Sequence, residues 1–157
     1  DARRYVDELL RDADAGTVLP FAQVRVAGGV PIGCTRFMDM RWWSGREVPD
    51  EVEVGGTWLA ASAQRTPINT EAKLLLFTHA FETWGVHRLA LATDARNERS
   101  RAAIERAGAR FEGVLRNHRF SYAEGEVGQP RDTALFAMTS GDWPSVKAAL
   151  EVRLAGS

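Results

Sequence analysis

The chain has 157 residues, 45% hydrophobic and 26% charged, which is enough for a single domain over residues 1–157 and too few for two. Its 20 basic and 21 acidic residues leave a formal net charge of −1, which argues against nucleic acid or an anionic membrane as a main partner. One cysteine, Cys34, excludes an internal disulfide, and no apolar run could span a bilayer or serve as a secretion signal, so we expect a cytoplasmic protein.

The first part of the chain predicts a helix followed by a hairpin. Residues 1–14 carry apolar side chains at helical spacing, with charges between them. Residues 17–27 and 31–41 alternate apolar and polar side chains, as half-buried strands do. Gly28-Gly29 between them is typical of a hairpin turn.

A strand, a helix and a second strand follow the loop at 42–50. Residues 51–60 predict a strand in which Gly55-Gly56 indicates a bulge or a close approach of backbone. The helix runs to about Trp84, where Gly85 stops it, and the next strand covers 86–93. Thr66 is expected to cap this helix and Pro67 to occupy its first position. The buried face is expected to hold Ala72, Leu75, Leu76, Ala80 and Trp84.

The strands at 51–60 and 86–93, joined by a helix, form a βαβ unit and should therefore be parallel. A short helix after Asn97, strands at about 110–122 and 131–140, and a final helix from Pro144 complete the chain. The predicted order is helix, three strands, helix, strand, helix, two strands, helix.

The stretch LATDARNERSRAAIERAGARFEG, from Leu91 to Gly113, is the most informative part of the sequence. Asn97 is a good N-cap, so free backbone N–H groups of the following helix point to the carboxyl end of the preceding strand. Ligands bind at this place in open α/β sheets. The sequence therefore predicts a binding site around Asn97 and Ser100.

The same stretch resembles the acetyl-CoA-dependent N-acetyltransferases of the GNAT superfamily, and within them the RimJ/RimL-type branch. The resemblance rests on Asn97-x-x-Ser100, then Glu105-Arg106-x-Gly108, then EGVLR at residues 112–116. Arg106 stands where the family usually has lysine, and one extra residue precedes Phe111. These differences leave the proposed chemistry untouched.

The resemblance implies the GNAT acyl-CoA N-acyltransferase fold, an α/β (α+β) architecture with a mixed central sheet flanked by helices. It also implies that the parallel strands near 51–60 and 86–93 splay apart, so that the pantetheine arm of acetyl-CoA can pair with the first of them. The family places a further strand and helix before Asp1, so we expect these to be missing from this chain.

Acetyl-CoA is the implied co-substrate, and no metal is expected. The loop at 64–70 occupies the register of the family's phosphate-binding pattern, Gln/Arg-x-x-Gly-x-Gly/Ala, but Ile68 and Thr70 replace its small residues. The alternative is a plain helix cap. The resemblance implies cofactor contacts from Trp58, Leu59, Ala60, Arg65, Thr66, Asn69, Thr70, Asn97, Ser100 and Arg106.

Asn97 and Ser100 are the implied catalytic residues: Asn97 would hold the cofactor near its thioester, and Ser100 would donate a proton or hydrogen bond to the departing sulfur. The alternatives are simple capping for Asn97 and solvent exposure for Ser100. No residue is an obvious general base, because Arg119 occupies the position at which some family members have a glutamate. The remaining candidates are Glu51, Glu53, His87 and His118.

A site without a strong base suits a weakly basic amine. An α-amine has a pKa of about 7.7–8, so about a tenth of it is neutral near pH 7, whereas a lysine at about 10.4 is almost wholly charged. Trp42, Glu53 and His118 are the candidate acceptor-binding residues, together with Trp43, Trp58, Phe120 and Tyr122. The pair Trp42-Trp43 could equally form a homodimer contact.

The sequence thus predicts an N-acetyltransferase that acts on a primary amine of a small molecule or protein N-terminus, by direct attack in a ternary complex. A non-catalytic CoA-binding or regulatory module on the same fold is the alternative, because the phosphate loop is altered and no base is evident.

Overall fold

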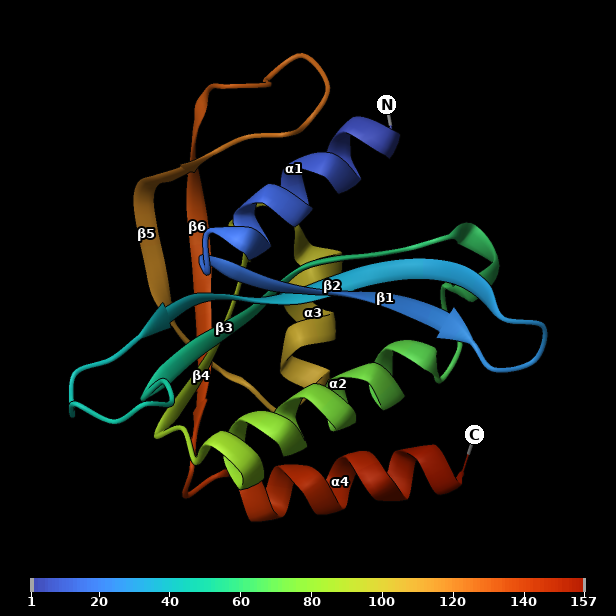
Figure 1. Ribbon diagram of the computed structural model, residues 1–157, viewed down its shortest axis with the longest axis vertical. Helices are drawn as coiled ribbons and strands as arrows, with labels where there is room; N and C mark the ends of the chain where they lie inside the picture. Colours follow the sequence, from blue (N-terminus) through green and yellow to red (C-terminus); the bar gives the residue numbers. More distant parts are fainter. Residues whose placement is uncertain (1, 157) are drawn as a thin grey trace.

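A computed structural model describes residues 2–156, and it confirms the predicted order of helices and strands (Figure 1). The elements, in chain order, are α1 (Ala2–Asp14), β1 (Val18–Arg25), β2 (Val30–Arg41), β3 (Glu51–Leu59), the 3-10 turn η1 (Ala61–Ala63), α2 (Ile68–Thr78), the π-helical turn η2 (His79–Trp84), β4 (Arg88–Asp94), α3 (Glu98–Arg106), β5 (Arg110–Phe120), β6 (Pro130–Thr139) and α4 (Trp143–Ala155). No helix among these residues is long and apolar enough to cross a membrane.

The six strands form one mixed sheet in the order β1-β2-β3-β4-β6-β5. All neighbouring pairs are antiparallel except β3 and β4, which are parallel as the βαβ unit requires. In Figure 1, β1 to β3 run across the molecule, whereas β5 and β6 run along its long axis. The change of direction occurs at the pair β3 and β4.

The strands β3 and β4 diverge after three ladder pairs. Glu51 pairs with Arg88, Val52 with Leu89 and Glu53 with Ala90, and the ladder between the two strands ends there in the described chain. The predicted splay is therefore confirmed. Beyond Glu53, β3 keeps its pairing with β2 on the other side, while β4 stays paired with β6 as far as Asp94.

The predicted bulge in β3 is present at Gly56. Cys34 pairs with Trp58 and Arg36 with Gly55, so β3 has one more residue than β2 between these pairs. Gly56 has a φ of 56°, and a Cβ built on it would lie 2.4 Å from Nε of Arg36. Glycine is favoured here by its backbone conformation, and a larger residue would also have to displace the end of the Arg36 side chain.

The helix after β3 reaches Trp84 as predicted, but its last six residues are π-helical. Gly85, with a φ of 62°, ends it in the left-handed conformation that favours glycine. The expected cap is wrong: α2 begins at Ile68 with Pro67 as its N-cap residue, and the Thr66 hydroxyl donates to the carbonyl of Ala63 instead. The wider turn η2 also rotates the apolar face relative to a regular helix.

The buried face of α2 differs from the predicted one. Leu75 is 66% exposed, whereas Lys73 is only 7% exposed. The buried residues of the segment are Lys73, Leu76, Phe77, Ala80 and Phe81. The core therefore includes a charged residue that the apolar pattern did not indicate.

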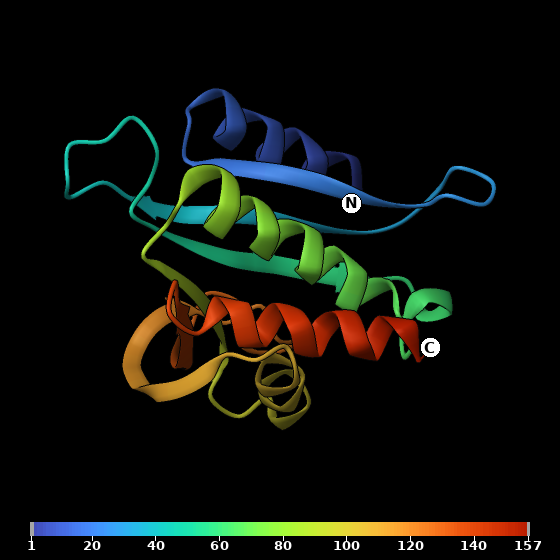
Figure 2. The same ribbon diagram turned by 90° about the horizontal axis from the view of Figure 1, so that it is seen from below.

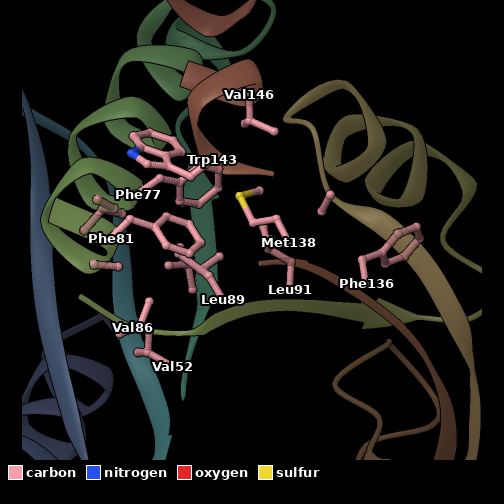
Figure 3. Packing of buried hydrophobic residues seen from close by; sticks show 14 of the residues in the cluster. Val52, Phe77, Phe81, Val86, Leu89, Leu91, Phe136, Met138, Trp143 and Val146 are labelled. Carbon is pink, nitrogen blue, oxygen red and sulfur yellow. The ribbon is translucent and has the colours of Figure 1, made fainter. Parts of the chain in front are cut away.

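The main core lies between the sheet and the helices α2 and α4, which run side by side in Figures 1 and 2. Figure 3 shows how Phe77 and Phe81 of this helical segment pack toward Trp143 of α4, over Leu89 of β4 and Met138 of β6. The ring planes of Phe81 and Trp143 are stacked, with centroids 5.3 Å apart. This packing fixes α2 above β3 and β4, where they begin to diverge.

Helices α1 and α2 cover opposite faces of β2. The hydroxyl of Tyr5 in α1 lies 3.3 Å from the sulfur of Cys34, whereas the next residue, Thr35, lies in a hydrogen-bonded group that reaches Lys73 of α2. Successive residues of a strand point to opposite faces, so the two helices enclose the sheet from both sides.

Candidate active site

A cavity of about 1020 Å³ opens where β3 and β4 separate. Its walls come from β3, the start of α2, β4, α3 and the loop between β5 and β6. The divergence of the strands is the cause of the cavity, because the space that a parallel ladder would fill is left open. A cavity of this size is at the upper end of the range of small-molecule sites.

The N-terminus of α3 forms one end of this cavity. The side chain of Asn97 accepts a hydrogen bond from the backbone N–H of Ser100 at 2.9 Å, so the predicted N-cap is confirmed. Both residues line the cavity. The hydroxyl of Ser100 has no hydrogen-bond partner among residues 2–156, so it is available to a ligand.

Residues 54–59 of β3 form the opposite wall. This edge of the strand faces the cavity because the ladder to β4 ends at Glu53. Backbone N–H and C=O groups need partners, and an extended chain bound in the wedge would supply them. The geometry therefore suits a ligand with an amide-bearing arm.

The cavity carries more positive than negative charge, although the chain as a whole is slightly acidic. The cationic lining residues are Lys73, Arg96, Arg99 and Arg131, and the acidic ones are Asp94 and Glu126, which leaves an excess of two positive charges. An excess of this sign attracts an anionic ligand.

Both acidic lining residues are held by one arginine. Arg96 donates to Asp94 at 2.9 Å and to Glu126 at 2.7 Å. Its hydrogen bonds lower the pKa of Asp94 to about 2 and also lower the pKa of Glu126. Carboxylates that are stabilised in their charged form are weak proton acceptors.

Two sides of the cavity are joined at its mouth by a hydrogen bond. Arg99 in the first turn of α3 donates to the side-chain oxygen of Gln64, in the loop before α2, at 2.8 Å. Both residues line the cavity. The bond links the loop before α2 to the first turn of α3.

The sequence profile of the family described as "Acetyltransferase (GNAT) domain" matches residues 1–110, which is well over half of the chain. The chain belongs to the GNAT acetyltransferase family. The confirmed splay of β3 and β4 agrees with the fold that the sequence motif implied.

Solved structures of other acetyltransferases have the same fold. A GCN5-related N-acetyltransferase from Brucella melitensis is 29% identical with a TM-score of 0.79, over 96% of this chain and 64% of that one. RimJ of Mycobacterium smegmatis, in complex with CoA-disulfide, is 25% identical with a TM-score of 0.74, over 96% of this chain and 67% of that one. The ribosomal-protein-S5-alanine acetyltransferase of Vibrio fischeri shares the fold at 19% identity, with a TM-score of 0.68, over 89% and 71%.

This GNAT chain spans a little under two thirds of the length of the Brucella protein. No curated protein matches its sequence. The likeness to RimJ agrees with the RimJ/RimL-type motif between Asn97 and Arg116.

The structure brings part of the predicted cofactor site of this GNAT domain together. The predicted cofactor residues that line the cavity are Trp58, Leu59, Asn69, Asn97 and Ser100. Those that lie outside its lining are Ala60, Arg65, Thr66, Thr70 and Arg106. Arg106 is in the last turn of α3, at the opposite end from Asn97, and Thr66 is bonded to Ala63. These assignments remain predictions.

The predicted acceptor residues are more scattered. Trp42 is in the loop after β2 and His118 is on β5, and neither lines the cavity. Glu53 is buried at the point of divergence, and both its carboxylate oxygens accept hydrogen bonds from Arg119 at 2.9 and 2.6 Å. Of the predicted aromatic set, Trp58 and Tyr122 line the cavity.

Several lining residues were missed by sequence reasoning. They are Lys73, Arg96, Arg99, Ser121, Glu126 and Arg131. Lys73 lies four residues after Asn69, one turn along the same helix face, and this spacing is a signal that the sequence did contain. Among residues 2–156, no three His, Cys, Asp or Glu side chains are grouped to ligate a metal ion.

Proposed function

We propose that this chain transfers an acetyl group from acetyl-CoA to a primary amine, and that the preferred acceptor is the α-amine of a protein N-terminus. The observation that carries the proposal is the wedge between β3 and β4, with the Asn97-capped start of α3 at its end. The excess positive charge of the cavity fits a ligand with phosphates.

In the proposed reaction, the neutral amine attacks the thioester carbonyl carbon while both substrates are bound. The C–N bond forms, the C–S bond breaks, and the amine gives up a proton as the sulfur leaves. A backbone N–H of β3 stabilises the negative charge that develops on the carbonyl oxygen. The Ser100 hydroxyl donates a hydrogen bond to the departing sulfur, and the proton released by the amine passes through solvent to the thiolate, so that CoA leaves as the thiol and Ser100 is unchanged.

The charge state of the cavity favours an α-amine over a lysine side chain. Asp94 and Glu126 are both paired with Arg96, and Glu53 is paired with Arg119. None of these carboxylates is free to take a proton from an ammonium group. About a tenth of an amine with a pKa of about 7.7–8 is neutral at pH 7 and can react without such help, whereas for an amine at about 10.4 the neutral fraction is well below about one in a thousand.

A likeness to known enzymes supports the acceptor class. RimJ of M. smegmatis was solved with CoA-disulfide, and the V. fischeri structure is described as acting on an alanine of ribosomal protein S5. The second protein is only 19% identical, so its substrate serves here as motivation for the assay.

The test combines calorimetry with acetyl-CoA and a thiol-release assay on a panel of amines between pH 6.5 and 9. We expect peptides with a free N-terminus to release CoA near neutral pH. Nα-acetylated peptides that contain lysine should be poor acceptors until the pH approaches the lysine pKa. Efficient turnover of lysine side chains at pH 7 would contradict the proposal on the acceptor.

A non-catalytic CoA-binding module remains the second candidate, because Ile68 and Thr70 replace small residues in the phosphate loop. The same experiment separates the two functions. Binding of acetyl-CoA without thiol release by any amine favours the module.

A further inference from the structure

Lys73 is an unusual residue in this chain. Of 20 lysines and arginines only two, Lys73 and Lys147, are lysine, so eighteen are arginine. Lys147 lies at the surface and pairs with Glu82 at 2.7 Å, whereas Lys73 is 7% exposed. Burying an ammonium group is unfavourable unless its charge and its three donors are satisfied.

The protein satisfies only part of this requirement. Nζ of Lys73 donates to the hydroxyl of Thr57 at 2.9 Å, and that hydroxyl lies 2.9 Å from the hydroxyl of Thr35. None of the ion pairs in the described chain includes Lys73, and Thr57 is its one hydrogen-bond partner there. Glu53, the carboxylate that raises the pKa of Lys73, directs both its oxygens to Arg119.

This incomplete pairing affects the pKa of Lys73. Burial lowers its pKa from the ordinary 10.5 to about 8, with Glu53 acting in the opposite direction. The group is still mainly charged at pH 7, so the cavity wall holds a cation with donors to spare.

Asn69 provides the complementary group. It lies one turn before Lys73 on α2 and lines the same cavity, and its Oδ1 is buried without a hydrogen-bond partner. An acceptor oxygen cannot bind a phosphate, which also presents acceptors, but it can bind an amide N–H. One turn of helix thus presents a donor and an acceptor to the cavity.

We propose that Lys73 and Asn69 bind the pantetheine arm of CoA, with Lys73 donating to an amide carbonyl oxygen and Asn69 accepting from an amide N–H. The assignment rests on the proposed function and adds to it a contact from α2. The pantetheine arm has two amide groups, and each offers one acceptor and one donor. Bound there, it completes the hydrogen bonds that the protein leaves open.

The role requires lysine and not arginine. A lysine side chain ends in a compact ammonium group with three donors on one atom, whereas a guanidinium is planar and offers a fixed fork of donors. The Thr57 hydroxyl accepts one N–H of the Lys73 ammonium group and leaves the other two for a ligand. The proposed contact thus gives a reason for lysine at this position in a chain with eighteen arginines.

The test is calorimetry with two ligands, CoA and 3′-phosphoadenosine 5′-diphosphate, which keeps all three phosphates of CoA and lacks only the pantetheine arm. We expect Lys73→Met to weaken CoA binding roughly 10-fold or more, as loss of a charged hydrogen bond does. Binding of the nucleotide fragment should be unchanged. The matched control is Lys147→Met, which should leave both affinities at the wild-type values.

A second measurement guards against a folding artefact. Lys73→Met should melt at or above the wild-type temperature without ligand, because it removes a buried charge that lacks an ion-pair partner. Protein labelled with ¹³C at the lysine ε-carbon should give two resonances. One of them should shift with CoA and stay in place with the nucleotide fragment.

The possible failures are distinct. If wild-type protein does not bind CoA, the proposed function is wrong and this assignment falls with it. If wild-type protein binds CoA and Lys73→Met binds it equally well, the assignment alone is wrong. Equal weakening of both ligands would place Lys73 at a phosphate and would also overturn it.

Discussion

Arg119 on β5 donates to both carboxylate oxygens of Glu53 on β3, with N–O distances of 2.9 and 2.6 Å. The two strands are separated in the sheet by β4 and β6, so this ion pair connects the two diverging halves of the sheet directly. Arg119 also donates to Asp39 at 2.6 Å. The ion pair therefore joins the two halves of the sheet at Glu53, where the ladder between β3 and β4 ends and the cavity begins.

Replacing Arg119 should therefore destabilise the fold. The Glu53 side chain is 6% exposed, so Arg119→Met leaves a buried carboxylate without its partner. Since the guanidinium itself is 25% exposed, we expect a loss of about 2–3 kcal/mol, at or below the usual range for breaking a buried pair. Urea denaturation measures this free energy of unfolding.

The double variant Glu53→Gln/Arg119→Met is the control, because it removes the charge as well as its partner. It should be more stable than Arg119→Met alone. A double variant that loses the sum of the two single effects would show that the residues do not act as a pair.

Asn97 can be tested as a helix cap and as a ligand contact by two substitutions. Asn97→Ala removes the acceptor for the Ser100 N–H and should cost about 1 kcal/mol of stability. Asn97→Asp keeps an equally good cap and should leave the melting temperature nearly unchanged. If Asn97 also contacts the cofactor, the aspartate variant should still lose kcat/KM, because a carboxylate has no N–H to donate. Full activity of Asn97→Asp would reduce the role of Asn97 to capping.

Ser100 should matter for the reaction and little for the fold. Its hydroxyl has no partner in the described chain, so Ser100→Ala should change stability by less than about 0.5 kcal/mol. Loss of the hydrogen-bond donor to the leaving sulfur should lower kcat by roughly 10²-fold, with the affinity for acetyl-CoA retained. Thiol release and calorimetry on the same preparation separate the two effects. An unchanged kcat would remove Ser100 from the proposed mechanism.

Local chemistry allowed the sequence to predict most of the fold. Alternation, turn glycines and caps are short-range signals, and they located the hairpin at Gly28-Gly29, the helix end at Gly85 and the cap at Asn97. The splay of β3 and β4 came from the resemblance at residues 91–113, since no local pattern shows where a parallel ladder stops. The π-helical turn η2 escaped prediction because no local sequence pattern distinguishes it from a regular helix end.

The site was predicted less completely, and for a physical reason. Asn97 and Ser100 lie within one turn, so their spacing alone brings them together. Lys73 and Thr57, or Glu53 and Arg119, meet only through tertiary structure, across 16 and 66 residues. The expectation that Leu75 of α2 is buried was wrong, because the pattern of apolar residues gave no reason to place Lys73 on the buried face.

The burial of Lys73 also predicts how stability changes at alkaline pH. Its pKa is about 8 in the folded chain and near 10.5 when exposed, so between these values the unfolded state binds more protons. The contribution of Lys73 is therefore unfavourable below pH 8, and stability should rise by up to about 3 kcal/mol as pH increases from 8 to 10.5. Glu53 is the charged group that opposes this shift.

Urea denaturation of wild type and Lys73→Met across this pH range isolates the effect. The difference in free energy of unfolding between the two proteins should grow with pH in favour of the wild type. Parallel curves would mean that Lys73 is solvated in the folded chain and is not the buried cation on which the cofactor contact depends.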